Sequence, residues 1–420
     1  MLALDFIRKN ADVVRRAGQL KGEPAPVDDV LRLDADWRRH QNRAETIKAE
    51  QNRLSKEFAK NRDEGLKERL RQMADEAKSE LAQADAVKSE LDDLLLRVPN
   101  IFHDSVPIGE TEADNKVIRE WGSKPDLGFA PRTHYDLGEA LGIMDFERAA
   151  RVSGSRFAFL VGDGARLERA LVQFMLDVHT REHGYTEMWP PMLVNSASMV
   201  GTANLPKFAD QAFKVQDRDL WLIPTAEVPL TNFHREEILD ADALPLRYVA
   251  YAASWRTEAG AAGKDTRGFI RVHQFSKVEL VKVTAAETSL DEFEALTRDA
   301  EDILQRLGLH YQVMAMCTGD MGFAQYKKYD LNAWAPGLDR YLEVSSCSTF
   351  IDFQAMRANI RYRAERGAPP RFAHTMNGSG LALPRTIDAI LETYQRSDGM
   401  ISVPSVLKPY MGGVELIGAR

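Results

Sequence analysis

The chain of 420 residues is poor in cysteine and has neither a long apolar run nor an excess of basic residues. Its two cysteines, Cys317 and Cys347, lie in unrelated contexts, which argues against a disulfide framework or a cysteine-based metal site. We therefore expect a protein of the reducing cytoplasm without structural zinc. The N-terminal segment lacks the apolar core of a signal peptide, and no stretch approaches membrane-spanning length, so no membrane association is expected. The formal net charge is −8, so a polyanionic partner would have to bind a local basic patch.

The N-terminal quarter has the pattern of a helical hairpin. Residues that are apolar, or that a coiled-coil core accepts, repeat with 3-4 spacing from Val30 to Phe58 and again from Leu66 to Leu94. The polar stretch Asn61 to Gly65 separates these two heptad seams. Two heptad helices of matched length joined by a short turn predict an antiparallel coiled coil. Pro99 cannot continue a helix, so the hairpin is expected over about residues 28–98, with a reach of about 50 Å.

Two interpretations of this hairpin remain open from the residues alone. It could be a coiled coil that dimerises the chain, with a solvated charged surface. Alternatively, it could be a projecting arm that grips a long partner. Acidic residues are interleaved with the basic ones, so the pattern supports a phosphate-binding surface only weakly. The basic residues outside the seams are Arg38, Arg39, Arg43, Lys48, Arg53, Lys56, Lys60, Lys67, Arg69, Arg71, Lys78 and Lys88.

After residue 110 the pattern changes to mixed helices and short alternating strands. An amphipathic helix is expected from Ala165 to His183, followed by a strand that ends at Pro190 and Pro191. No βαβ phosphate fingerprint occurs, which favours an antiparallel sheet with helices packed on it. The predicted fold class is therefore α+β, with an N-terminal domain over residues 1–110 and a larger domain over residues 111–420.

Three motifs resemble known sites but lack essential residues. The segment from Gly260 to Thr266 resembles a nucleotide-binding P-loop, but it has Glu258 in place of the first glycine and Asp265 in place of the required Ser or Thr. The glycines around Gly378 lack the third glycine of a dinucleotide fingerprint. His179 and His183 have zinc-ligand spacing on one helix without the accompanying glutamate, so a helix-surface or interface pair is the better interpretation.

The segment from Trp255 to Leu280 points to a different nucleotide site. In a strand, one face is expected to carry Arg271, His273, Phe275, Lys277 and Glu279, and the other Ile270, Val272, Val278 and Leu280. An amphipathic surface strand would show the same alternation. Here, however, the Phe275 ring can stack on a base. The guanidinium groups of Arg256 and Arg271, which are expected nearby, suit phosphates. The carboxylates of Glu258 and Glu279 can hold an amine or a metal, which predicts a site for ATP and an amino compound.

A third element agrees with a nucleotide site. The residues after Asn377 predict a helix that begins near Pro384, with Ile387, Ile390, Leu391 and Tyr394 as its buried stripe. Arg385 then lies at the helix N-terminus, where the dipole disfavours a cation by up to about 1 kcal/mol. An anion nearby would offset that cost, although an arginine exposed to solvent fits the segment as well.

Together, these residues resemble the class II aminoacyl-tRNA synthetases, and among them the seryl-tRNA synthetase family, over essentially the whole chain. The three class motifs are the helix and strand ending at Pro191, the W-R-T-E…F-I-R-V-H-Q-F hairpin and the G-L-A-L-P-R helix. More specific are T-A-E-V-P-L-T-N at Thr225, C-T-G-D-M-G at Cys317, Y-L-E-V-S-S-C-S at Tyr341 and N-G-S-G at Asn377. The family also carries the N-terminal hairpin for tRNA binding. The resemblance implies a homodimeric ligase that activates L-serine with ATP and transfers it to tRNA(Ser). The sequence leaves open whether the selenocysteine tRNA is a further acceptor.

The resemblance also implies roles for individual residues. Arg256, Arg271 and Arg385 would be the catalytic cations: Arg256 on the α-phosphate and the seryl carboxylate, and Arg385 on the adenine and the γ-phosphate. Glu258 would accept the adenine amino group and Phe275 would stack on the base. The implied ATP-binding set also includes Thr257, Val272, Glu343, Val344, Ser345 and Ser346, with Glu343 and Ser346 holding Mg²⁺. The implied serine-binding set is Thr225, Ala226, Glu227, Arg256, Glu279 and Ser379.

Some positions depart from the family pattern without removing an implied ligand, namely Trp255, Asn332, Thr349, Met356 and the pair Leu383 and Pro384. Two alternatives to a seryl-tRNA synthetase are weaker. A synthetase-like ligase that loads an amino acid onto a carrier protein would lack the long arm. A catalytically inactive relative would have lost arginines or magnesium ligands, whereas Arg256, Arg271, Glu343 and Arg385 are all present.

Overall fold

The computed structural model describes residues 1–259 and 267–418. Contacts divide the chain into two compact units, Met1–Pro99 and Asn100–Arg420. None of the helices within the described ranges combines the length and the apolar composition needed to cross a membrane. The segment from Gly260 to Thr266, which resembles a P-loop, lies outside the described residues.

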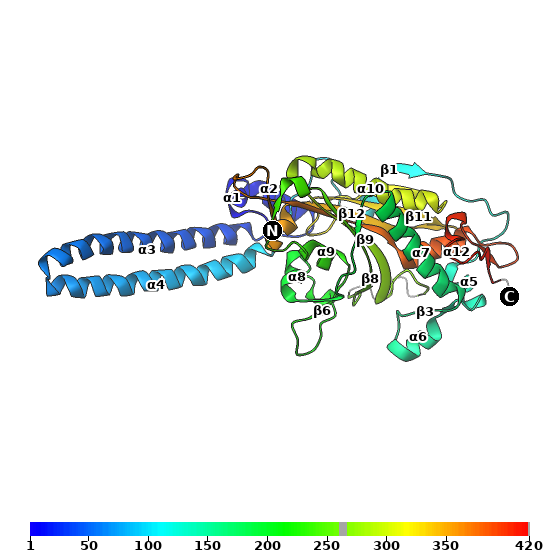
Figure 1. Cartoon of the computed structure of the whole chain (residues 1–420), viewed down its shortest axis with the longest axis horizontal. Helices are drawn as coiled ribbons and strands as arrows, with labels where there is room; N and C mark the ends of the chain where they lie inside the picture. The colour runs from blue at the N-terminus through cyan, green and yellow to red at the C-terminus, as the bar shows by residue number, and fades with distance from the viewer. Residues whose placement is uncertain (260–266, 419–420) are drawn as a thin grey trace. The chain divides into compact units, whose positions relative to one another are not determined.

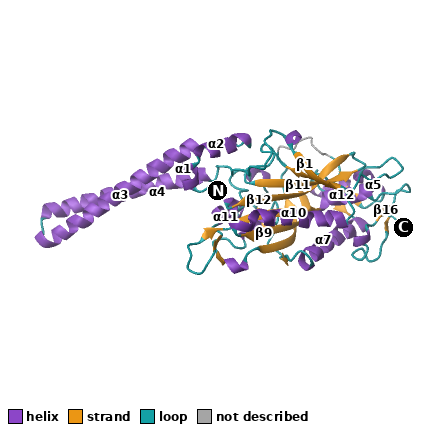
Figure 2. Ribbon diagram, turned by 90° about the horizontal axis from the view of Figure 1, so that it is seen from above, coloured by secondary structure: helices purple, strands orange, loops and turns teal. Residues whose placement is uncertain are grey.

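The first unit consists of helices. Two short ones, α1 (Leu4–Lys9) and α2 (Ala11–Leu20), precede the long pair α3 (Val27–Asn61) and α4 (Glu64–Leu95), which lie antiparallel and side by side (Figures 1 and 2). Every predicted seam position is buried or half-buried, and Val30, Ala84 and Leu91 are fully buried. The predicted hairpin is therefore confirmed.

The turn of the hairpin takes two residues. Arg62 adopts a left-handed conformation (φ 49°) that ends α3, and the Asp63 carboxylate accepts a hydrogen bond from the Gly65 N–H (2.8 Å) to cap α4. Arg43 pairs with Glu76 (2.7 Å) and His40 with Glu80 (2.6 Å) across the two helices. These cross-helix contacts supplement the apolar seam and fix which residues of α3 and α4 face each other.

The second unit is built on a mostly antiparallel sheet of eight strands in the order β1-β10-β11-β12-β15-β9-β8-β4. Within the described residues, all neighbouring strands of this sheet are antiparallel except the short β4, which pairs in parallel with β8. The fold class expected from the sequence is thus confirmed. The strands are β1 (Lys116–Trp121), β4 (Thr186–Glu187), β8 (Leu246–Trp255), β9 (Gln274–Thr284), β10 (Tyr311–Ala315), β11 (Lys327–Ala335), β12 (Arg340–Ile351) and β15 (His374–Ala382).

The main core lies between this sheet and three helices, α7 (Asp163–Arg181), α10 (Ser289–Arg306) and α12 (Leu383–Thr393), which Figure 1 shows next to the strands. Helix α10 packs on β12 and β15, and α7 packs on β8 and β9. Val278 and Leu280 of β9 point into this core, as the alternation predicts. The alternate residues of β9, such as Glu279 and Val281, point to the opposite face of the sheet.

The opposite face has its own smaller core, formed under α8 (Ser196–Gly201) and α9 (Glu227–Asn232) by residues such as Met199, Ala250 and Val281. The strand predicted up to Pro190 is shorter than expected, because β4 ends at Glu187 and two prolines follow soon after. The remaining helices are α5 (His134–Ala140), α6 (Phe146–Ser153) and α11 (Phe353–Ala358). Small sheets are formed by β2 (Met144–Asp145) with β3 (Phe159–Leu160), β5 (Leu193–Val194) with β6 (Trp221–Leu222), β16 (Ile401–Ser402) with β17 (Leu416–Ile417), and β7 (Ile238–Asp240) with β13 (Arg361–Arg363) and β14 (Arg371–Phe372).

Candidate active site

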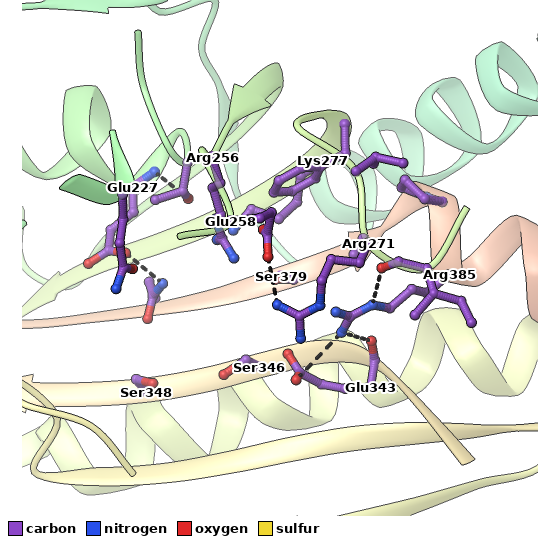
Figure 3. A pocket seen from close by; sticks show the side chains of 18 of the residues that line it. Glu227, Arg256, Glu258, Arg271, Lys277, Glu343, Ser346, Ser348, Ser379 and Arg385 are labelled. Atoms are coloured by element: carbon purple, nitrogen blue, oxygen red, sulfur yellow. Dashed lines mark hydrogen bonds and ion pairs between the residues drawn. The ribbon is translucent and has the colours of Figure 1, made fainter. Parts of the chain in front are cut away.

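A polar cavity of about 530 Å³ opens on the face of the sheet opposite α7 and α10. Its wall combines side chains from β9, β12 and β15 with the start of α12, the connection between β8 and β9 and the residues before α9. Figure 3 shows this arrangement, with Arg271, Arg385 and Glu343 gathered at one end and Glu227 at the other. The predicted site residues that line the cavity are Thr225, Glu227, Arg256, Glu258, Arg271, Val272, Phe275, Glu343, Ser346, Ser379 and Arg385.

Irregularities in two strands turn these side chains toward the cavity. Glu343 and Ser346 are three residues apart, so regular alternation would place them on opposite faces of β12. The register shifts between these residues, where Ser345 pairs with Leu331 and Glu343 with Asn332, so Val344 is the extra residue of a β-bulge. The bulge brings Glu343 to the same side as Ser346.

Strand β15 also contains a β-bulge. Ser379 pairs with Glu279 and Leu381 with Val278, which leaves Gly380 as the extra residue. The bulge lets Asn377, Ser379 and Ala382 all line the cavity although Ser379 and Ala382 are three residues apart.

The alternation predicted for the segment before β9 is wrong in part. From Phe275 onward it holds, and Phe275 and Lys277 line the cavity as expected. Before Gln274, however, the chain is not in strand conformation, so Ile270, Arg271 and Val272 all line the cavity.

The arginine end of the cavity is ordered by pairing among its own residues. Arg271 donates a hydrogen bond to the Glu258 carboxylate (2.6 Å). Arg385 donates from Nε to the Ile270 carbonyl (3.1 Å) and from Nη1 to the Glu343 carbonyl (2.8 Å), and its Nη1 lies 3.5 Å from the Glu343 carboxylate. The Arg256 guanidinium lies 5.1 Å from the centre of the Phe275 ring. The guanidinium groups of Arg271 and Arg385 are therefore held where an anion could replace their carboxylate partners.

Glu343 sits next to a second pair of charges. Lys328 lies 3.2 Å from the Asp330 carboxylate on β11, and both residues are buried or half-buried. Burial would raise the pKa of Glu343, but Arg385 and Lys328 outweigh it and hold that pKa below its usual value. Burial raises the pKa of Asp330 to about 6, although Lys328 acts in the opposite direction. Glu343 is therefore an anion at neutral pH.

The other end of the cavity is a network of buried carboxylates and amides. The Asn377 amide donates to both Glu227 (3.0 Å) and Glu279 (3.0 Å), and the Thr225 hydroxyl donates to Glu279 (3.1 Å). Lys277 forms an ion pair with Glu279, which is fully buried. Burial raises the pKa of Glu227 to about 7, and the nearby negative charge of Glu279 adds to the shift.

A buried amide fixes the position of Glu227. The Gln354 amide nitrogen donates to Glu227 (2.6 Å), and its carbonyl oxygen accepts from the Thr375 hydroxyl (2.7 Å). With the amide in this orientation, its nitrogen meets the Glu227 carboxylate and its oxygen meets a hydroxyl that can donate, so both contacts are satisfied. This end of the cavity offers acceptors for an ammonium group and both donors and acceptors for a hydroxyl.

Five predicted site residues do not line the cavity. Glu279 lies behind Thr225 and Asn377, and the side chain of Val344 is buried in the main core. Ser345 donates to the Ser379 carbonyl (2.6 Å), Ala226 packs in the smaller core, and Thr257 bonds to the Asp210 carbonyl (2.7 Å). The side chains of these last four residues are thus engaged away from the cavity.

Sequence reasoning gave no role to several residues that shape the cavity. Alternation places Lys277 on the cavity face but does not reveal its ion pair with Glu279. Asn377 lies two residues before Ser379, so alternation could have identified it. Lys328 and Gln354 carry no such signal, because only the folded sheet brings them near the site. His179 is fully buried below Gly380 rather than on a helix surface. Within the described residues, no group of three or more His, Cys, Asp or Glu side chains could hold a metal ion.

Comparisons with known proteins match both units of the chain. Residues 1–102 match the family model of the seryl-tRNA synthetase N-terminal domain, and residues 212–394 match that of the tRNA synthetase class II core domain (G, H, P, S and T). A serine–tRNA ligase from Caldanaerobacter subterraneus is 52% identical over 98% of both chains. One from Halalkalibacterium halodurans is 57% identical over 85% of this chain and 84% of its own.

The crystal structure of seryl-tRNA synthetase from Pyrococcus horikoshii complexed with ATP superposes with a TM-score of 0.95 at 39% identity, covering 99% of each chain. The similarity therefore extends over the helical hairpin, the sheet and the cavity alike. With relatives above 50% identity along nearly the full length and an N-terminal domain specific to one amino acid, the chain belongs to the seryl-tRNA synthetase family.

Proposed function

We propose that the protein is a serine–tRNA ligase that converts L-serine and ATP to seryl-adenylate and pyrophosphate and then transfers the seryl group to tRNA(Ser). The observation that carries this proposal is the division of one cavity into an end with arginines and an end with buried carboxylates. The first end suits a triphosphate and the second suits the amine and hydroxyl of serine. Membership of the family supports the same reaction.

The adenylation step joins two anions, because the serine carboxylate attacks the α-phosphorus of ATP and pyrophosphate leaves. The protein must therefore bring the reactants together and neutralise their charge rather than supply a covalent group. Arg256 lies between the two ends of the cavity and is proposed to bind the α-phosphate and the serine carboxylate together. Its guanidinium also lies near the Phe275 ring, which is proposed to stack on the adenine.

The remaining ATP contacts are assigned by position. Glu258 is proposed to accept a hydrogen bond from the adenine amino group. Arg385 is proposed to contact the adenine and the γ-phosphate, and Arg271 is proposed to lie near the same phosphate. Because the side chains of Thr257, Val344 and Ser345 are engaged away from the cavity, they are proposed to act through their main-chain atoms, whereas Val272 contributes its side chain to the cavity wall.

The chemistry of the residues on β12 fits a magnesium ion. The Glu343 carboxylate and the Ser346 hydroxyl are hard oxygen donors on one side of the bulge, and Mg²⁺ is usually held by one or two carboxylates together with substrate phosphates. We propose that these two residues hold Mg²⁺ with ATP. When bound, the ion neutralises charge on the phosphates. Glu343 is suited to this role because Arg385 and Lys328 keep it ionised.

Serine is proposed to bind at the carboxylate end. The ammonium group would pair with Glu227, which lines the cavity. The hydroxyl would meet Thr225 and Ser379 at the cavity wall, and Glu279 would act from behind Thr225. Ala226 would contribute only backbone, since its side chain is buried in the smaller core.

The hairpin of α3 and α4 is proposed to bind tRNA. The N-terminal domain, residues 1–110, would hold the acceptor RNA while residues 111–420 carry out the chemistry. A chain with a net charge of −8 needs a local set of Lys and Arg residues to bind a polyanion, and the hairpin supplies one. The family resemblance further supports a cytoplasmic homodimer.

The function is tested by ATP–pyrophosphate exchange with each of the twenty amino acids, followed by aminoacylation of tRNA(Ser) and of the selenocysteine tRNA. Exchange that depends on serine alone supports the proposal. Exchange that depends on another amino acid would overturn it.

The first prediction concerns Arg256. Its replacement in Arg256→Ala should lower kcat for pyrophosphate exchange by about 100- to 1,000-fold, because loss of one charge partner of the transition state costs about 3–4 kcal/mol. Steady-state pyrophosphate exchange measures kcat, and circular dichroism checks that the variant is folded. Arg298→Ala, which removes an exposed arginine from α10, is the matched control and should leave kcat unchanged. Equal kinetics for both variants would remove Arg256 from the site.

The second prediction follows from the pKa of Glu227, which is about 7. The serine ammonium favours the ionised carboxylate, so binding below this pKa must release a proton, and the affinity falls about tenfold per pH unit below it. The serine KM should therefore decrease as the pH rises from about 6 to 8 and then level off. In Glu227→Gln the serine KM should be high and nearly independent of pH. A variant that keeps the wild-type pH profile would show that another group titrates.

The third prediction concerns the hairpin. Deleting Val30 to Val98 and closing the gap with a short linker should spare serine activation, because every proposed ATP and serine ligand lies after residue 220. Charging of tRNA(Ser) should fall steeply, and the dependence of tRNA binding on salt should flatten as phosphate contacts are lost. Exchange, charging and the mass in solution are measured on one variant. Were the hairpin a dimerisation coil instead, the variant would become monomeric and both reactions would fall together.

A further inference from the structure

Three titratable side chains outside the cavity form a fully buried cluster. His134 at the start of α5 lies between Asp388 and Glu392, which occupy successive turns of α12, and all three side chains have no exposed surface. The His134 Nδ1 lies 2.7 Å from Glu392 and its Nε2 lies 3.5 Å from Asp388. Helices α5 and α12 are in contact, as Figure 1 shows near the C-terminal end of the chain.

The two carboxylates differ in how they are satisfied. Glu392 accepts hydrogen bonds from the main-chain N–H groups of His134 (2.9 Å), Gly337 (2.8 Å) and Leu338 (3.1 Å) as well as from the imidazole. In contrast, neither Asp388 oxygen nor His134 Nε2 has a hydrogen-bond partner among the described residues. Asp388 is thus held mainly by its charge, in an ion pair with His134 slightly longer than a hydrogen bond.

The protonation of the cluster follows from its burial. Burial would lower the pKa of His134, but Asp388 and Glu392 raise it above its usual value. Burial raises the pKa of Asp388 to about 7, with Glu392 adding to the shift and His134 opposing it. Replacing a buried ion pair by apolar side chains of similar size is often neutral or stabilising, so stability alone gives no reason for these charges.

The cluster is joined to the cavity through two neighbours. Asp388 lies one turn after Arg385 on α12. Gly268, two residues before Ile270, packs so closely on His134 that a Cβ atom there would be 2.3 Å from Nε2. The Ile270 carbonyl in turn accepts the hydrogen bond from Arg385 Nε. One imidazole therefore contacts both the helix that carries Arg385 and the segment that carries Arg271.

We propose that His134, Asp388 and Glu392 are positioning residues for ATP. The ion pairs hold α12 and the segment Gly268–Arg271 in one fixed arrangement, so that Arg385 and Arg271 meet the phosphates without reorganisation. None of the three touches ATP, and all act through the two arginines. This inference rests on the proposed function, because it assumes that Arg385 and Arg271 bind ATP.

The test compares KM values for ATP and serine in pyrophosphate exchange. In Asp388→Asn and His134→Gln the two arginines would no longer be held in place for the ATP phosphates, so the ATP KM should rise by about tenfold or more. The serine KM should change less than twofold. Ile390→Val is the matched control, because it trims a buried side chain on the same helix without touching the cluster, and both KM values should stay unchanged.

Asp388→Leu separates positioning from stability. His134 keeps Glu392 as its partner in this variant, so no buried charge is left unpaired, and the melting temperature should stay the same or rise while the ATP KM still rises. A double-mutant cycle completes the test. In the Arg385→Ala background, Asp388→Asn should raise the ATP KM by a smaller factor than in the wild-type protein, because one of the two guanidinium groups through which the cluster acts is missing.

An unchanged ATP KM in Asp388→Leu, equal rises in both KM values, or additive effects in the cycle would overturn the inference. A wild-type protein without serine-dependent exchange would instead overturn the proposed function. The two failures are therefore distinguishable in one series of assays.

Discussion

The cavity depends on the register of three adjacent strands, β9, β12 and β15. Side chains alternate along a strand, so a slip of one residue in β9 would turn Phe275, Lys277 and Glu279 into the main core. The bulges at Val344 and Gly380 then adjust the neighbouring strands, so that residues three apart share one face. The helices on the other side of the sheet fix this register by burying the residues between.

The register also places opposite charges together. Arg271 faces Glu258, Arg385 faces Glu343, and Lys277 faces Glu279, so these cations and carboxylates of the site lie in pairs. The desolvation of each charge is offset by its partner, and the pairs order the guanidinium groups. The buried cluster of His134, Asp388 and Glu392 extends this arrangement into the helix layer.

Much of this could be predicted from the sequence, and the reasons for the misses are physical. The heptad seams and the alternation from Phe275 onward are local patterns, and both are present in the structure. The chain before Gln274 is not in strand conformation, so alternation predicts the wrong side for Ile270 and Val272. The bulge at Val344 appears only in the pairing of β12 with β11, which the local sequence does not reveal. Gln354 and Lys328 come near the site only through tertiary contacts.

The serine hydroxyl is proposed to be recognised by Thr225 and Ser379, with the buried Glu279 behind them. This recognition is tested by the ratio of kcat/KM for serine and for alanine in pyrophosphate exchange. Alanine would leave buried polar groups unpaired, so a preference for serine of about 10,000-fold or more is expected. A preference of only about 10- to 100-fold, as expected from a pocket that merely encloses the side chain, would contradict it.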